Sequence, residues 1–137
     1  LLLASESAMQ THGLTARARI VAHSRNSLAP EAFTLAPIGA TEQVLAKAGW
    51  STSDVDLWEI NEAFAMVTML TMRAFDLDPA CVNVHGGACA QGHPVGSTGS
   101  RIIVTLMHAL KRYGKKRGVA ALCIGGGEAT AVAIELI

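Results

Sequence analysis

The sequence is poor in aromatic residues and in charge of either sign. Aromatic residues make up 4% of its 137 residues and charged residues 16%, and 11 Lys and Arg balance 11 Asp and Glu. A chain without excess positive charge lacks the electrostatic signature of proteins that bind nucleic acid or anionic membranes. It also lacks an apolar run near the roughly 20 residues of a spanning helix, and a basic amino-terminal leader. We therefore expect a cytoplasmic protein with small-molecule partners, no nucleic acid and no membrane.

Cysteine is scarce and unpaired in the sequence. The three cysteines are an odd number and form no CxxC pair, which favours reduced thiols over a disulfide framework. Half of the residues are hydrophobic, and the length corresponds to about one domain with a core of its own. We find no internal repeat and no low-complexity segment.

What the sequence does contain is an alternation of strand-like and helix-like periods. Helices are expected over 6–12, 38–48, 63–75 and 98–113, and strands over 17–23, 55–60, 81–84, 119–124 and 129–137. The order βαβαβαββ predicts an α/β fold with a mixed, mostly parallel five-stranded sheet and helices on both faces. The helix over 63–75 is apolar nearly all round and is expected to be buried, with Asn61 as its N-cap. Residues 1–5 resemble the end of a buried strand, and without an initiator methionine we expect further sequence before them.

Three polar groups fall just beyond predicted strands. Asn61 follows one strand, His93 lies in the loop after the next, and Cys123 ends a third. In open α/β sheets, reactive loops gather beyond the carboxyl ends of the strands. We therefore expect Asn61, His93 and Cys123 to meet around one small cleft.

His93 has the setting of a catalytic histidine. Gly92 and Pro94 flank it, which constrains its backbone and leaves its ring poorly covered. Imidazole exchanges protons near neutral pH. Taken without its neighbours, a loop histidine more often serves only to satisfy local hydrogen bonds.

Cys123 precedes the run Gly125–Gly127. Most cysteines at the end of a buried strand are small core residues. Here the glycines allow backbone N–H groups close to a ligand, and oriented amides stabilise a thiolate. Cys81 and Cys89 lack such a setting and are expected to be structural.

A zinc site is the competing interpretation of the histidine loop. His85, Cys89 and His93 are spaced by four, which would align them on a helix, and Cys123 would complete the ligand set. The glycines and Pro94 make that helix improbable. No metal is expected.

The motifs Asn61–Ala65 (NEAFA), Gly86–Arg101 (GGACAQGHPVGSTGSR) and Cys123–Gly127 (CIGGG) resemble those of the thiolase family in order and approximate spacing. The resemblance covers nearly the whole chain. It implies acyl transfer between CoA thioesters, either formation of acetoacetyl-CoA or cleavage of a 3-ketoacyl-CoA by CoA. CoA thioesters would be substrates, and no other cofactor is implied.

The resemblance also implies a domain division. A thiolase subunit has two similar halves, and residues 16–137 resemble the carboxyl-terminal half. Residues 1–15 would be the tail of the amino-terminal half, with its last strand and a short helix. The family's nucleophilic cysteine lies in that amino-terminal half, so this chain alone is expected to be inactive. A complete protein would form a homodimer or homotetramer.

Residue roles follow from the same resemblance. His93 resembles the histidine that activates the nucleophile and then helps to bind a thioester oxyanion. Asn61 resembles the residue that holds a water there, Cys123 the acid/base thiol, and Gly125 the backbone donor of a second oxyanion hole. Phe33 and Phe64 are expected near the acyl group of the substrate.

Departures from the family pattern leave two questions open. Phe33 stands where many short-chain members carry a smaller side chain, and Gln91 and Glu128 are polar where aliphatic or small residues are common. The acyl chain length and the favoured direction are therefore open. The alternative is a non-catalytic acyl-CoA-binding module with a thiolase-like fold.

Overall fold

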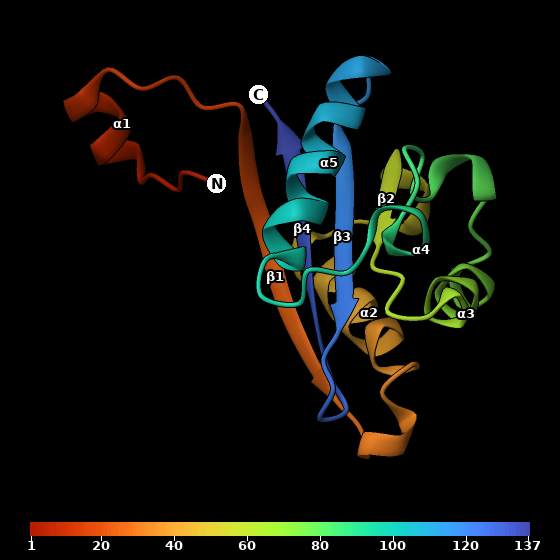
Figure 1. Cartoon of the computed structure of the whole chain (residues 1–137). Helices are drawn as coiled ribbons and strands as arrows, with labels where there is room; N and C mark the ends of the chain where they lie inside the picture. Colours follow the sequence, from red (N-terminus) through yellow and green to blue (C-terminus); the bar gives the residue numbers. More distant parts are fainter.

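Four strands form one mixed sheet in the order β1-β4-β3-β2 (Figure 1). In this computed structural model, which describes residues 1–137, β1 (Ala18–Ser27) pairs antiparallel with β4 (Glu128–Leu136), and β4 pairs antiparallel with β3 (Arg117–Cys123). Only β3 and β2 (Leu57–Ile60) run parallel. The α/β class and the mixed sheet are confirmed, whereas the expectation of mostly parallel strands is wrong. The turn between β3 and β4 is short, so these two strands must run antiparallel. β1 also pairs antiparallel, along the free edge of β4.

The fifth strand, expected over residues 81–84, is not formed. The segment holds the 3-10 helix η3 (Pro79–Cys81) and a single parallel bridge between Trp58 and Val82. Asn83 ends the pairing because its φ of 47° is left-handed. The Asn83 side chain bonds to the backbone of Ile60 where a neighbouring strand would otherwise do so. Oδ1 accepts from the Ile60 N–H at 2.9 Å, and Nδ2 donates to the Ile60 carbonyl at 2.9 Å.

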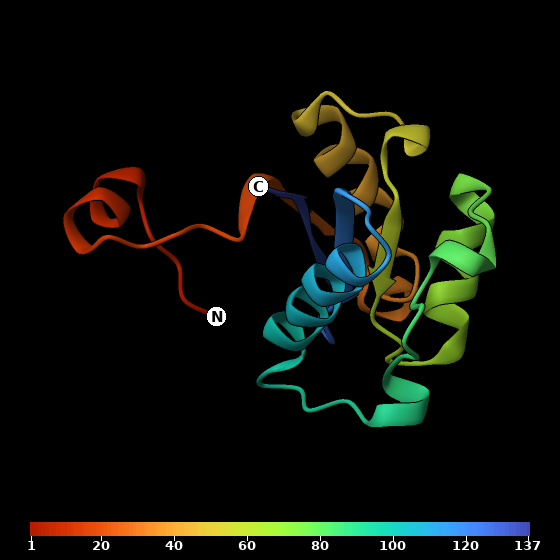
Figure 2. The ribbon, with the colours of Figure 1, turned by 90° about the horizontal axis from the view of Figure 1, so that it is seen from above.

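Helices cover both faces of the sheet (Figure 2). On one face, α2 (Ala36–Ala48) and α3 (Ala65–Phe75) build a core cluster of 16 buried residues that includes Val44, Trp58 and Val67. On the other face, α5 (Thr98–Arg112) builds a cluster of seven buried residues around Leu106. This arrangement confirms the expectation of helices on both faces, since alternate strand residues point to opposite sides.

Glycines end the helices where the sequence predicts. Gly49 follows α2 with a φ of 68°, and Gly114 lies beyond α5 with a φ of 63°. These left-handed angles are accessible to glycine without steric cost, so they close the helices. The remaining short elements are η1 (Pro30–Ala32), η2 (Thr52–Asp54) and the one-turn α4 (Ala88–Gln91). No helix of the chain has both the length and the apolar character needed to cross a bilayer.

α3 differs from its prediction in two respects. It begins at Ala65 with Phe64 as N-cap, so Asn61 does not cap it. It is also not buried all round, because Met69 is 65% exposed while two of its three buried residues are Thr68 and Thr71. The buried threonines bond to carbonyls, Thr68 to that of Ile60 at 3.1 Å, which is how a polar residue is accommodated in a core.

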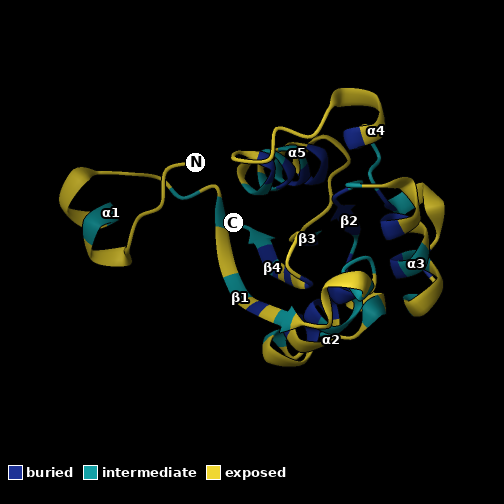
Figure 3. Ribbon diagram, turned by 60° about the horizontal axis from the view of Figure 1, so that its bottom comes forward, coloured by how far each residue is buried: buried dark blue, intermediate teal, exposed yellow.

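The amino-terminal segment stands apart from the sheet (Figure 3). α1 (Glu6–His12) forms as predicted, with Ser5 accepting from the Ala8 N–H and Gly13 closing the helix, but none of its residues is buried. The strand expected over residues 1–5 is absent from the structure. Leu2 is 83% exposed, because no strand of this chain lies beside it to pair with.

Candidate active site

Asn61 and His93 meet at the carboxyl end of β2. Asn61 directly follows this strand and is buried, and its backbone N–H extends the ladder to the Ala121 carbonyl at 2.9 Å. Its side-chain Nδ2 lies 3.5 Å from His93 Nε2, although 32 positions separate the residues. The expected convergence of these two groups is therefore present in the structure.

The turn that leads into α5 holds the other side of the His93 ring. His93 Nδ1 lies 2.7 Å from the hydroxyl of Thr98, the first residue of α5. That hydroxyl also donates to the Pro94 carbonyl at 3.1 Å, which receives the backbone N–H groups of Ser97 and Thr98 as well. Both ring nitrogens of His93 thus have partners on the protein, and the ring plane is defined.

Arg101 approaches Asn61 from the next turn of α5. Its Nη2 donates to Asn61 Oδ1 at 3.1 Å. The Nε and Nη1 atoms of Arg101 are buried without a hydrogen-bond partner in the chain. A donor-only cation therefore lies behind the amide group that faces the histidine.

Glu62 ties the histidine loop to the end of β2. One carboxylate oxygen accepts from the Cys89 N–H and the other from Asn83 Nδ2, both at 2.9 Å. A side chain on Gly87 would collide with this carboxylate, so any larger residue there would force the carboxylate out of its place. Burial acts to raise the pKa of Glu62, but these hydrogen bonds outweigh it and hold the pKa below its ordinary value.

Cys123 ends β3, the parallel neighbour of β2. The register pairs Ile60 with Ala121, so Cys123 lies near the edge that carries Asn61. Its side chain belongs to the core cluster with α2 and α3, and it makes no hydrogen bond to Asn61 or His93. Burial raises the pKa of its thiol above the ordinary value, so the resting group is the protonated thiol.

The glycine turn after Cys123 is open to solvent at Gly125. The turn is closed by the Gly127 N–H, which donates to the Ile124 carbonyl at 3.1 Å, and Gly127 has a φ of 94°. No atom lies within 4 Å of where a Gly125 side chain would stand, and its N–H donates to no carbonyl of the chain. Its amide is thus free to bind an oxygen atom of a ligand.

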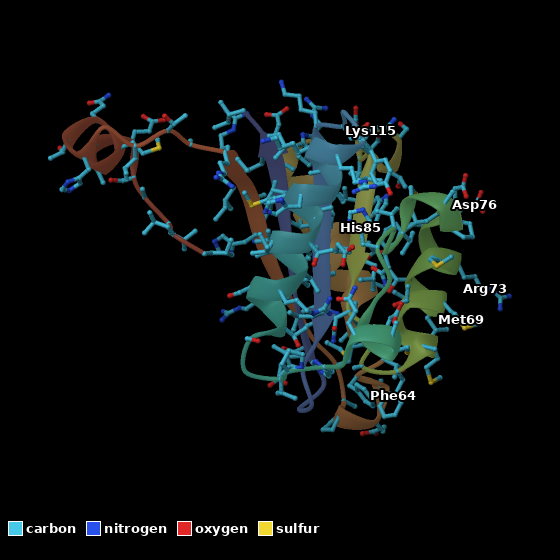
Figure 4. The ribbon with its side chains drawn as sticks, turned by 45° about the horizontal axis from the view of Figure 1, so that its top comes forward. Phe64, Met69, Arg73, Asp76, His85 and Lys115 are labelled. Atoms are coloured by element: carbon cyan, nitrogen blue, oxygen red, sulfur yellow. The ribbon has the colours of Figure 1, made fainter.

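Phe33 and Phe64 are brought together near the start of α3. Their ring centroids are 6.0 Å apart in an edge-to-face arrangement. Phe64 is 59% exposed, and Figure 4 shows it below Met69 and Arg73, which follow along α3. The pair presents apolar surface near the start of α3.

Two hollows of this chain lie away from these residues. One of about 300 Å³ lies beside the last turns of α5 and is lined by Arg17, His108 and Lys111 among others. The chain assembles no group of three or more His, Cys, Asp and Glu side chains suited to a metal ion. His85, one of the four residues considered for zinc, instead packs against Tyr113 with ring centroids 5.6 Å apart.

The sequence of residues 14–136 matches the family described as thiolase, C-terminal domain. The chain belongs to the thiolase family. Mouse cytosolic acetyl-CoA acetyltransferase is 52% identical over 118 residues, which are 86% of this chain and 30% of that protein. Mouse mitochondrial 3-ketoacyl-CoA thiolase is 43% identical over 134 residues, 98% of this chain and 34% of that protein.

Solved thiolase structures share the fold. Human mitochondrial 3-ketoacyl-CoA thiolase in complex with CoA superposes with a TM-score of 0.94 at 45% identity, covering 98% of this chain and 34% of that chain. Bacillus anthracis acetyl-CoA acetyltransferase gives a TM-score of 0.92 at 44% identity, covering 97% and 34%. The chain spans about a third of the length of these relatives.

Four residues around this candidate site were not identified from the sequence: Glu62, Asn83, Thr98 and Arg101. The helix over 98–113 was expected, but its apolar pattern did not indicate that Thr98 and Arg101 turn toward His93 and Asn61. Asn83 gave no signal, because it was assigned to a strand. Its left-handed backbone is a property that the sequence pattern does not display.

Proposed function

We propose that this chain supplies the acid/base side of a thiolase active site, which catalyses acyl transfer between CoA thioesters. The contact of Asn61 with His93 at the sheet edge carries the proposal, because it joins two motifs of a chain that belongs to the thiolase family. Relatives named acetyl-CoA acetyltransferase and 3-ketoacyl-CoA thiolase, and a neighbour solved with CoA, support CoA thioesters as substrates. No other cofactor is part of the proposal.

His93 is proposed to activate a nucleophilic cysteine that the amino-terminal half of a thiolase provides. The neutral imidazole takes the thiol proton as the sulfur attacks the carbonyl carbon of the substrate. The resulting imidazolium then donates to a thioester oxyanion, and Asn61 holds a water at the same oxygen. The position of both groups at one sheet edge supports this division of labour.

Cys123 is proposed as the group that exchanges a proton with the C2 carbon of acetyl-CoA. In thiolysis the C–C bond breaks, its electron pair remains on the departing acetyl-CoA enolate, and the Cys123 thiol supplies the proton. In condensation the thiolate removes that proton again. The raised pKa of Cys123 supports the protonated form as the resting state, and the free amide of Gly125 suits the second oxyanion hole.

The apolar pair Phe33 and Phe64 is proposed to border the acyl group. Their contact supplies a surface without hydrogen-bonding groups, which suits an alkyl chain or the acetyl methyl group. The domain division at residue 15, the amino-terminal partner half, and a homodimer or homotetramer of the complete protein belong to the same proposal. We further propose the cytosol as its location, in line with the 52% identity to a cytosolic relative.

A hybrid enzyme tests the proposal. The matching 118 residues of mouse cytosolic acetyl-CoA acetyltransferase are replaced by those of this chain, and thiolysis of acetoacetyl-CoA is measured. The hybrid is expected to turn over. His93→Ala and Cys123→Ser are expected to lower kcat by about 10²- to 10⁴-fold, as loss of an acid/base group does. Cys89→Ser is the matched control, because this exposed thiol has no proposed role.

Calorimetry with a CoA thioester completes this test. A hybrid that binds the thioester but never turns it over would identify the non-catalytic acyl-CoA-binding alternative. Full activity in Cys123→Ser would remove this residue from the acid/base role.

A further inference from the structure

We propose that Arg101 and Thr98 are positioning residues that hold His93 in one tautomer, with the proton on Nδ1 and the lone pair on Nε2. The significance of this tautomer for acyl transfer rests on the proposed function. The tautomer itself is a property of the folded chain and is measured without any activity.

Arg101 determines which way the Asn61 amide points. A guanidinium has N–H donors and no acceptor, so the atom of Asn61 that lies 3.1 Å from Nη2 must be the carbonyl Oδ1. The reversed amide would set its own N–H groups against those of Arg101. Since Asn61 is only 1% exposed, water cannot relieve such a clash.

The orientation of Asn61 then determines the state of His93 Nε2. With Oδ1 directed to Arg101, the amide turns Nδ2 toward His93 Nε2 at 3.5 Å. A hydrogen on Nε2 would face the N–H donors of Asn61. An unprotonated Nε2 accepts from Asn61, so the ring proton belongs on Nδ1.

Thr98 provides the acceptor that the Nδ1 proton needs. Its hydroxyl oxygen lies 2.7 Å from Nδ1, and the Pro94 carbonyl at 3.1 Å offers an acceptor for its single hydrogen. The oxygen therefore accepts from His93. Thr98 is 1% exposed at the first position of α5, which prevents water from taking its place.

Together these contacts form one directed chain of donors. Arg101 donates to Asn61, Asn61 to His93, His93 to Thr98, and Thr98 to the Pro94 carbonyl. In the proposed reaction, only this tautomer presents a basic nitrogen on the side of the ring that faces Asn61. Arg101 and Thr98 themselves need not touch the substrate.

The tautomer is tested by long-range ¹H–¹⁵N correlation NMR on the ¹⁵N-labelled 137-residue chain, at a pH of about 8.5 where free imidazole is neutral. His93→Gln identifies the His93 signals among the five histidines. We expect a protonated Nδ1 and a bare Nε2. A predominant Nε2–H tautomer in the unmodified chain would overturn the inference without any variant.

Matched variants test the two positioning residues. Thr98→Val keeps the branched shape but removes the acceptor, and we expect the Nε2–H tautomer to gain population, whereas Thr98→Ser restores the original pattern. Arg101→Met is expected to release the Asn61 amide and mix the two tautomers of His93. Arg101→Lys can still donate, so we expect its tautomer ratio to be nearer to that of the unmodified chain. An unchanged tautomer in a folded Thr98→Val chain would exclude Thr98 from this role.

Kinetics of the hybrid enzyme separates this inference from the proposed function. Thr98→Val is expected to lower kcat about 10-fold with little change in KM, less than the roughly 10²- to 10⁴-fold loss of a general base. An inactive hybrid with the expected tautomer would contradict the proposed function alone. An active hybrid with the Nε2–H tautomer would contradict only the inference.

Discussion

Glu59 is a carboxyl that the fold keeps largely out of water. It lies within β2, is 1% exposed, and its Oε1 has no hydrogen-bond partner in the chain. Burial raises its pKa from 4.5 to about 7, and the negative charge of Glu62 adds to the effect, while Arg101 opposes it. Glu59 therefore stays protonated up to a pH of about 7, whereas the ordinary pKa of a glutamate is 4.5.

This proton makes stability depend on pH. The folded chain holds the Glu59 proton more tightly than the unfolded chain, so its stabilisation is complete below pH about 4.5 and is lost as pH rises through about 7. We expect the free energy of unfolding of the unmodified chain to fall by about 2 to 3 kcal/mol relative to Glu59→Gln between pH 5 and pH 8. Urea denaturation of both proteins across this range measures the difference. Both proteins contain the same histidines, so the contribution of histidine titration cancels in this difference. Parallel curves for the two proteins would show that Glu59 ionises as freely as an exposed carboxyl.

Among single residues, His93 and Asn61 were recognised from the sequence, and Thr98 and Arg101 were not. Glycine and proline beside a histidine are visible in any sequence, and so is an asparagine after an apolar run. The partners of these groups depend on the start of α5, which the sequence pattern placed correctly but without side-chain directions. The role of Asn61 as an N-cap was wrong because α3 begins only at Ala65, and the Asn61 amide turns to Arg101 and His93 instead.

At the level of elements, α5 packs on β3 closely enough to require a glycine. A side chain on Gly118 would place its Cβ 2.8 Å from Leu106 Cδ1, and Leu106 is completely buried. Gly118→Ala is expected to lower the free energy of unfolding by about 1 to 3 kcal/mol, because an overpacked core forces its neighbours to move. Chemical denaturation monitored by tryptophan fluorescence measures the change.

Gly96→Ala is the control for this experiment. Its added methyl group meets no atom within 4 Å and its backbone is not left-handed, so we expect a change within about 0.5 kcal/mol. Equal stability of Gly118→Ala and Gly96→Ala would mean that α5 shifts freely on the sheet.

The elements that the sequence predicted well are those with a repeating apolar pattern and a clear stop. α2 and α5 have both, and their ends at Gly49 and Gly114 were anticipated. Residues 81–84 were assigned to a strand because their composition is that of a strand. The side chain of Asn83 completes the hydrogen bonds of Ile60 from outside the ladder, and no local pattern distinguishes this from strand pairing.

At the level of the whole molecule, the amino-terminal segment contributes little to the folded core of this chain. α1 buries none of its residues, and a helix of seven residues is marginal in water without packing. We expect deletion of residues 1–13 to change the free energy of unfolding by less than about 0.5 kcal/mol, as for other surface changes that touch no packed group. The urea midpoint of the shortened chain provides the measurement. A loss of more than about 1 kcal/mol would reveal contacts with the sheet.

The sequence by itself determined the class of fold, the two helix-covered faces and the family, because apolar periodicity, glycine stops and short motifs are local properties of the chain. Only the tertiary structure decided the order and directions of the four strands and the partners of the site residues. Arg101 reaches Asn61 across 40 positions of the chain, and such a contact depends on how β2 and α5 pack together. Hydrophobic pattern determines which face of an element is buried, but hydrogen bonds between elements depend on distances that arise only once the core has formed.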